Sequence, residues 1–64
     1  MTIPELVEKL QANQYRTDAI ARIIGYIVMI QGLGWDELRL SRQSKSGLQK
    51  TFRSIGIDPH TIRI

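Results

Sequence analysis

The spacing of apolar residues predicts a first amphipathic helix from Ile3 to about Asn13. Thr2 followed by Glu5 has the spacing of a capping box, in which each residue binds the backbone of the other. Pro4 is tolerated in the first helical turn, where its missing N–H is not needed. The apolar stripe of this helix comprises Ile3, Leu6, Val7 and Leu10.

A second segment, from Asp18 to about Gln31, carries apolar residues around well over half of its helical circumference. A surface helix of a small bundle needs an apolar stripe only about 100° wide. We therefore expect this helix, with Thr17 as its N-cap, to be central in the fold or to pack against a second chain as well. The β-branched run 23–30 also fits a buried strand, but the uninterrupted pattern is long for a strand and favours helix.

Glycines and serines divide the C-terminal half into shorter elements. Glycines 32 and 34 end the second helix, and a short helix is expected from Trp35 to about Leu40. Ser41 or Ser44 then caps a further helix that runs to about residue 54 or 55, where Gly56 stops it.

The last ten residues, 55–64, have two interpretations. Asp58 as N-cap with Pro59 after it would begin a final helical turn, which the sequence slightly favours. Alternatively, the flanking isoleucines pair across an Asp-Pro-His-Thr turn and form a small hairpin. In either case the pattern predicts an all-α fold class: a single domain, residues 1–64, built as a small helical bundle of four to five short helices.

Composition excludes several classes of function. The 64 residues include no cysteine and one histidine, His60, so we expect neither a disulfide nor a metal site, and no cofactor. His60 has no activated partner or phosphate-binding loop beside it, so the protein is not expected to be an enzyme. The longest uncharged stretch, 23–35, is shorter than the roughly 20 residues that cross a bilayer. The lack of cysteine fits a cytoplasmic protein.

Positive charge is concentrated in the C-terminal half. The net charge of +3 arises entirely from residues 34–64, and between Arg39 and Arg53 there are five basic residues and no acidic one. Such an asymmetry favours a polyanionic partner. The alternative is a solvated face that keeps the protein in solution.

The segment 38–52, LRLSRQSKSGLQKTF, begins with the pattern apolar–x–apolar–Ser at residues 38–41. A polar, basic helix is expected to follow it. This pattern resembles the turn and recognition helix of helix-turn-helix DNA-binding proteins, in which the second helix enters the major groove. The resemblance implies a DNA-binding transcriptional regulator of bacterial or phage type, acting as a homodimer on half-sites about one helical turn apart. Leu48, Phe52 and Ile55 would be buried. The residues implied in contact with double-stranded DNA are Arg39, Arg42, Gln43, Lys45, Ser46, Gln49, Lys50 and Arg53.

Three features depart from the motif, and two other functions stay open. Arg39 stands where the turn usually has glycine, Lys45 where an apolar residue is usual, and GLGW interrupts the region of the motif's first helix. The broad apolar arc of the helix 18–31, with Met29 on its far side, also fits a helical protein-interaction module: an inhibitor, antitoxin-like subunit or adaptor. RNA binding would use the same basic residues, although Phe52 is the only aromatic among them.

Overall fold

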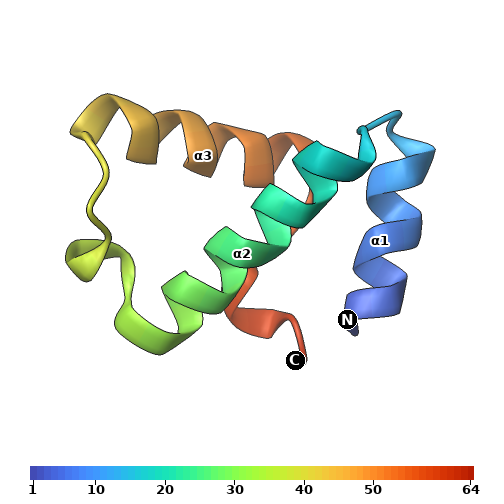
Figure 1. Cartoon of the computed structure of the whole chain (residues 1–64), viewed down its shortest axis with the longest axis horizontal. Helices are drawn as coiled ribbons and strands as arrows, with labels where there is room; N and C mark the ends of the chain where they lie inside the picture. The colour runs from blue at the N-terminus through green and yellow to red at the C-terminus, as the bar shows by residue number, and fades with distance from the viewer.

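The computed structural model describes all residues, 1–64, and contains helices but no strand (Figure 1). The elements are α1 (Ile3–Ala12), α2 (Thr17–Leu33), the 3-10 helix η1 (Trp35–Glu37), α3 (Arg42–Ile55) and the 3-10 helix η2 (Pro59–Thr61). The all-α fold class is confirmed. The expected four to five short helices are not: there are three α-helices, and the segments 35–40 and 55–64 contribute one 3-10 turn each.

Helix α1 begins with the capping box that the sequence predicts. The Thr2 hydroxyl accepts a hydrogen bond from the Glu5 backbone N–H, and the Glu5 carboxylate accepts one from the Thr2 N–H, both at 3.4 Å. The helix ends at Ala12, and the side chain of Asn13 donates to the Lys9 carbonyl at 2.7 Å. The capping box and the expected helix, which ends one residue before Asn13, are therefore confirmed.

Helix α2 is helical throughout, so the strand interpretation of residues 23–30 is wrong. It starts at Thr17 itself, and Arg16 takes the extended N-cap position without a side-chain hydrogen bond, so the expectation of Thr17 as N-cap was also wrong. At its other end α2 continues past Gln31 to Leu33, because the chain leaves the helix only at Gly34, whose φ of 84° favours glycine. None of the helices is both long and apolar enough to span a membrane.

Helix α3 is bounded by a serine and a glycine. Ser41 is the N-cap: its hydroxyl accepts a hydrogen bond from the Ser44 backbone N–H at 3.1 Å. Gly56 ends the helix with a left-handed backbone at φ 77°, as glycine commonly does after a helix. The predicted helix and its stop are confirmed.

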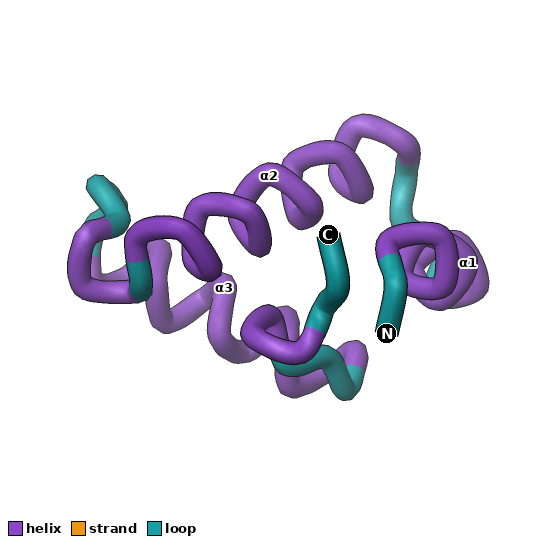
Figure 2. The backbone as a smooth tube through the Cα atoms, turned by 90° about the horizontal axis from the view of Figure 1, so that it is seen from below, coloured by secondary structure: helices purple, strands orange, loops and turns teal.

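The C-terminal tail forms the helical turn and not the hairpin. Asp58 accepts a hydrogen bond from the His60 backbone N–H at 2.9 Å, and Pro59 opens the 3-10 turn. The tail returns beside the N-terminus, where the Arg63 N–H donates to the Met1 carbonyl at 2.7 Å (Figure 2). The only β-type pairing is an isolated bridge between Thr2 and Arg63.

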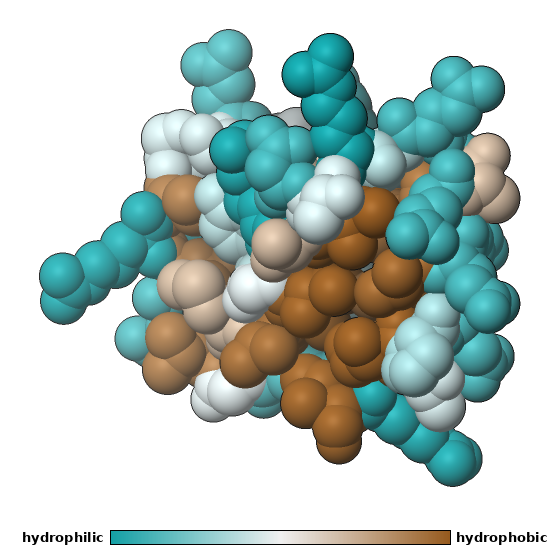
Figure 3. Space-filling model, turned by 45° about the vertical axis from the view of Figure 1, so that its right-hand side comes forward, coloured by the Kyte–Doolittle hydropathy of each residue, from teal (hydrophilic) through white to brown (hydrophobic).

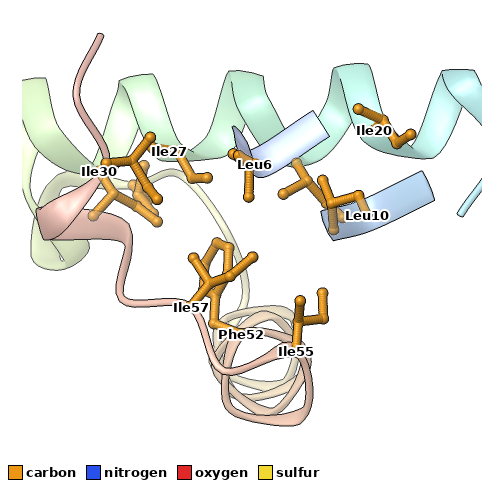
Figure 4. Close-up of a cluster of buried hydrophobic side chains, with 11 residues drawn as sticks. Leu6, Leu10, Ile20, Ile27, Ile30, Phe52, Ile55 and Ile57 are labelled. Atoms are coloured by element: carbon orange, nitrogen blue, oxygen red, sulfur yellow. The ribbon is translucent and has the colours of Figure 1, made fainter. Parts of the chain in front are cut away.

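Helix α2 is the central element, as its broad apolar arc predicts. It lies against α1, η1 and η2. One apolar core fills the space between these elements and α3, and side chains from all three α-helices point into it (Figure 4). The buried residues of this core are Leu6, Leu10, Ile20, Ile23, Ile27, Ile30, Leu38, Phe52, Ile55, Ile57 and Ile62.

Candidate nucleic-acid interface

Helix α3 has a buried side and a solvent side. Phe52 and Ile55 are buried, and Leu48 packs against the core while half-exposed, so the predicted stripe faces inward. Trp35 of η1 packs its ring edge-on against Phe52, with the ring centres 6.2 Å apart and the planes at 74°. This contact ties η1 to α3 and leaves the opposite side of α3 in solvent.

The residues implied in DNA contact lie almost entirely on that solvent side. Seven of the eight are exposed, and Lys45 is half-buried. By helical angle Lys45 borders the buried stripe, which accounts for its partial burial. We call this set the basic face: Arg39, Arg42, Gln43, Lys45, Ser46, Gln49, Lys50 and Arg53.

Helical spacing orders the basic face around α3. At about 100° per residue, Gln43, Ser46 and Lys50 point most directly away from the buried stripe. Arg42 and Arg53 lie on one line along the flank, separated by three helical turns. The structure thus brings together on one helix seven residues that the sequence pattern selected.

Arg39 reaches the same region from the linker before α3. Leu38 is buried, Arg39 is exposed and Leu40 is half-buried, which is the alternation of an extended segment. Leu38 belongs to the core, and this anchor turns Arg39 outward.

The polar groups of the basic face are free of internal partners. None of its eight side chains makes a hydrogen bond within the chain, whereas Ser44 and Thr51 of the same helix do. Helix α3 carries no acidic residue, and its basic groups can therefore donate charge-assisted hydrogen bonds to an incoming anion without first breaking contacts.

The dimensions and position of α3 suit insertion into a groove. Its 14 residues span about 21 Å, and a helix with side chains is about 10–12 Å wide. The major groove of duplex DNA is about 12 Å wide. Figure 1 shows α3 along one edge of the molecule, with its N-terminal end at a corner far from α1.

A shallow depression of about 280 Å³ adjoins one end of the basic face. Gln49 and Arg53 belong both to the lining of this depression and to the basic face. Asp58 also lines the depression, so its carboxylate marks the end of the basic surface there. Sequence spacing cannot predict this depression, because η1, α3 and the tail each contribute to it. Its lining comprises Trp35, Gln49, Phe52, Arg53, Ile57, Asp58, Pro59 and His60.

Comparison with known proteins adds no assignment. No protein-family model matches the chain, and no curated protein and no solved structure matches it significantly.

Proposed function

We propose that this protein binds double-stranded DNA through the basic face and acts as a small transcriptional regulator in the cytoplasm. One observation carries the proposal: the solvent side of α3 is basic and polar, contains no carboxylate, and has no internal hydrogen bonds. A carboxylate on such a surface would repel phosphate, and internal partners would have to be displaced before binding.

Residues of the basic face divide into two roles by their chemistry. Arg42 and Gln43 lie in the first turn of α3, at the exposed corner, and their side chains form bidentate hydrogen bonds with guanine and adenine edges respectively. Lys50, Arg53 and Arg39 supply cations along the helix and its linker, suited to the phosphates on either side of the groove.

The proposal depends on the surface of α3 and not on a compact motif. Eight residues, 34–41, separate α2 from α3, whereas the turn of a helix-turn-helix has three or four. Helix α3 is nevertheless held rigidly, because Phe52 and Ile55 anchor it in the core and Ser41 caps it.

Burial of the one aromatic residue in α3 favours duplex DNA over single-stranded RNA. Proteins that bind single strands commonly stack bases on exposed aromatic rings. Phe52 is only 3% exposed and packs against Trp35, so the basic face offers no ring for stacking.

Charge reversal on the basic face tests this function. The double variant Arg42→Glu/Lys50→Glu should lose retardation of duplex DNA at low salt and keep the helical circular-dichroism spectrum. Arg16→Glu/Arg63→Glu is the matched control: it changes the net charge equally at two exposed positions outside the basic face, and it should still bind. Equal retardation by the two double variants would refute the assignment to α3.

A protein-interaction module remains the second candidate function, because α2 leaves apolar side chains in solvent. Val28, Met29 and Leu33 are 46%, 43% and 57% exposed. Exposed apolar surface of this kind marks contact with another protein chain.

A further inference from the structure

The shallow depression beside the basic face is the one pocket of the molecule, and part of its lining is apolar. Phe52, Ile57 and Pro59 line it as buried residues, and Trp35 lines it as a half-buried one. The edge-on contact with Phe52 holds the Trp35 ring in place. The depression therefore presents a fixed apolar surface to a ligand.

Two opposite charges line this same depression without pairing with each other. Arg53 comes from α3 and Asp58 from the tail, and both are exposed. No hydrogen bond joins them, and the Arg53 side chain makes none within the chain. Asp58 accepts the His60 backbone N–H at 2.9 Å through Oδ1, which orients the carboxylate and leaves Oδ2 without a partner. One cation and one anion are thus available to a single ligand.

The size of the depression limits its occupant to a small molecule. Its volume of about 280 Å³ lies just below the roughly 300–1,000 Å³ of sites for drug-sized ligands. The other large apolar surface differs in kind, because the apolar side chains over α1 and α2 form a continuous area without a pocket (Figure 3). The depression alone combines a hollow, an aromatic ring and two opposite charges.

We propose that this depression binds a free α-amino acid with a large apolar side chain, held as its zwitterion. The carboxylate of such a molecule meets Arg53, which forms paired hydrogen bonds with carboxylates, and the amide of Gln49 one helical turn away. Its ammonium group meets the free oxygen of Asp58, and its side chain packs on Trp35. A peptide segment is excluded as the occupant, because only a free amino acid carries both charged groups on one carbon atom.

Ligand and DNA compete for the residues that the depression shares with the basic face. This consequence rests on the proposed function, whereas the ligand site itself does not. With the amino acid bound, Arg53 is withdrawn from phosphate, and the amino acid acts as an effector that weakens DNA binding. The slope of log Kobs against log salt should become shallower by about 0.9, the contribution of one phosphate contact.

The fluorescence of Trp35 reports on this site directly, because it is the only tryptophan of the chain. The probe is L-phenylalanine, whose ring does not absorb where indole is selectively excited. We expect a saturable change with a dissociation constant of about 1 mM, as befits a ligand of few atoms. Phenethylamine lacks the carboxylate and phenylpropionate lacks the ammonium group, and each should bind about tenfold more weakly.

Matching each charged side chain to its ligand group makes the test specific. Arg53→Gln should weaken binding of L-phenylalanine about tenfold and should not weaken binding of phenethylamine, which has no carboxylate to lose. Asp58→Asn should weaken L-phenylalanine but not phenylpropionate. Asparagine caps a helical turn as well as aspartate does, so this variant should keep its circular-dichroism spectrum. Arg16→Gln, at an exposed arginine outside the depression, is the control and should bind like the wild type.

The results separate the ligand site from the DNA contact, since the fluorescence titration contains no DNA. No saturable change at about 10 mM L-phenylalanine would overturn the proposal. Equal binding of L-phenylalanine and both analogues would also overturn it, because it would show only that aromatic rings adhere to Trp35. Binding of L-phenylalanine with an unchanged salt slope for duplex DNA would refute the competition for Arg53.

Discussion

Gln31 of α2 holds Ile62 of the C-terminal tail: its side-chain N–H donates to the Ile62 carbonyl at 2.6 Å. The same amide nitrogen donates to the Pro59 carbonyl at 2.8 Å. These two bonds fix η2 against the end of α2, where Ile62 belongs to the core. Together with the bond from the Arg63 N–H to the Met1 carbonyl, this side chain holds the C-terminal tail against the rest of the fold.

Removing this amide should destabilise the whole domain. Gln31→Ala leaves two part-buried carbonyl groups without a partner, and we expect a loss of about 1–3 kcal/mol in the free energy of unfolding. In a domain of this size each kcal/mol lowers Tm by roughly 4–8 °C. Thermal unfolding followed by circular dichroism measures the loss. Gln11→Ala, at an exposed position of α1 without side-chain hydrogen bonds, is the control, and an equal Tm for both variants would contradict the role of Gln31.

Two glycines near α3 should respond to alanine in opposite directions. Gly47 lies inside the helix with open space around it, so Gly47→Ala should stabilise the protein by about 1 kcal/mol. Gly56 has a φ of 77°, where a Cβ atom costs about 1–2 kcal/mol, so Gly56→Ala should destabilise it. Urea unfolding of the two variants measures the change in the free energy of unfolding for each. A stabilising Gly56→Ala would show that α3 does not end in a left-handed residue at position 56.

Local rules in the sequence account for most of the elements. The capping box at Thr2, the Ser41 cap and the Gly56 stop depend on contacts within four residues, and each was predicted. The start of α2 was not predicted correctly. Its N-cap is Arg16, whose side chain makes no capping hydrogen bond, so no local pattern indicates this position. The residues 35–40 form only a 3-10 turn, because Leu38 and Leu40 are drawn into the core in an extended segment.

Features that depend on distant parts of the chain could not be predicted. The bonds of Gln31 to the tail span about thirty residues, and no periodicity indicates them. The pattern on α3 did predict which residues share its solvent side, because helical geometry alone decides that. It could not predict that α2 leaves Val28 exposed, since this depends on where α1 and the tail pack.

The cap of α3 should affect DNA binding by two separable routes. Ser41→Ala removes the hydrogen bond to the Ser44 N–H, which should cost about 1 kcal/mol and loosen the turn that carries Arg42 and Gln43. Ser41→Asp keeps a capping side chain and the stability, but adds a negative charge beside phosphate. Both variants should bind duplex DNA more weakly than Ser54→Ala, an exposed serine without such a bond. Unchanged affinity in Ser41→Asp would place the DNA away from this end of α3.

The salt dependence of binding should separate phosphate contacts from base contacts. With Arg39, Lys50 and Arg53 at phosphates, log Kobs should fall with log salt with a slope of about −2.7. Lys50→Ala should make the slope shallower by about 1. Gln43→Ala should leave the slope unchanged and reduce discrimination between sequences. Fluorescence anisotropy of a labelled duplex measures the slope of each variant and its discrimination between sequences. Equal slopes for Lys50→Ala and the wild type would show that Lys50 does not contact a phosphate.

The most direct test of the proposed function is a map of backbone amide chemical shifts during titration with duplex DNA at low salt. A chain of 7.3 kDa is well suited to this measurement. We expect the shifted amides to cluster between Arg39 and Arg53, largest in the first turn of α3, with the outer face of α2 unchanged. No shifts at low salt, or shifts centred on α1 or α2, would contradict binding through the basic face.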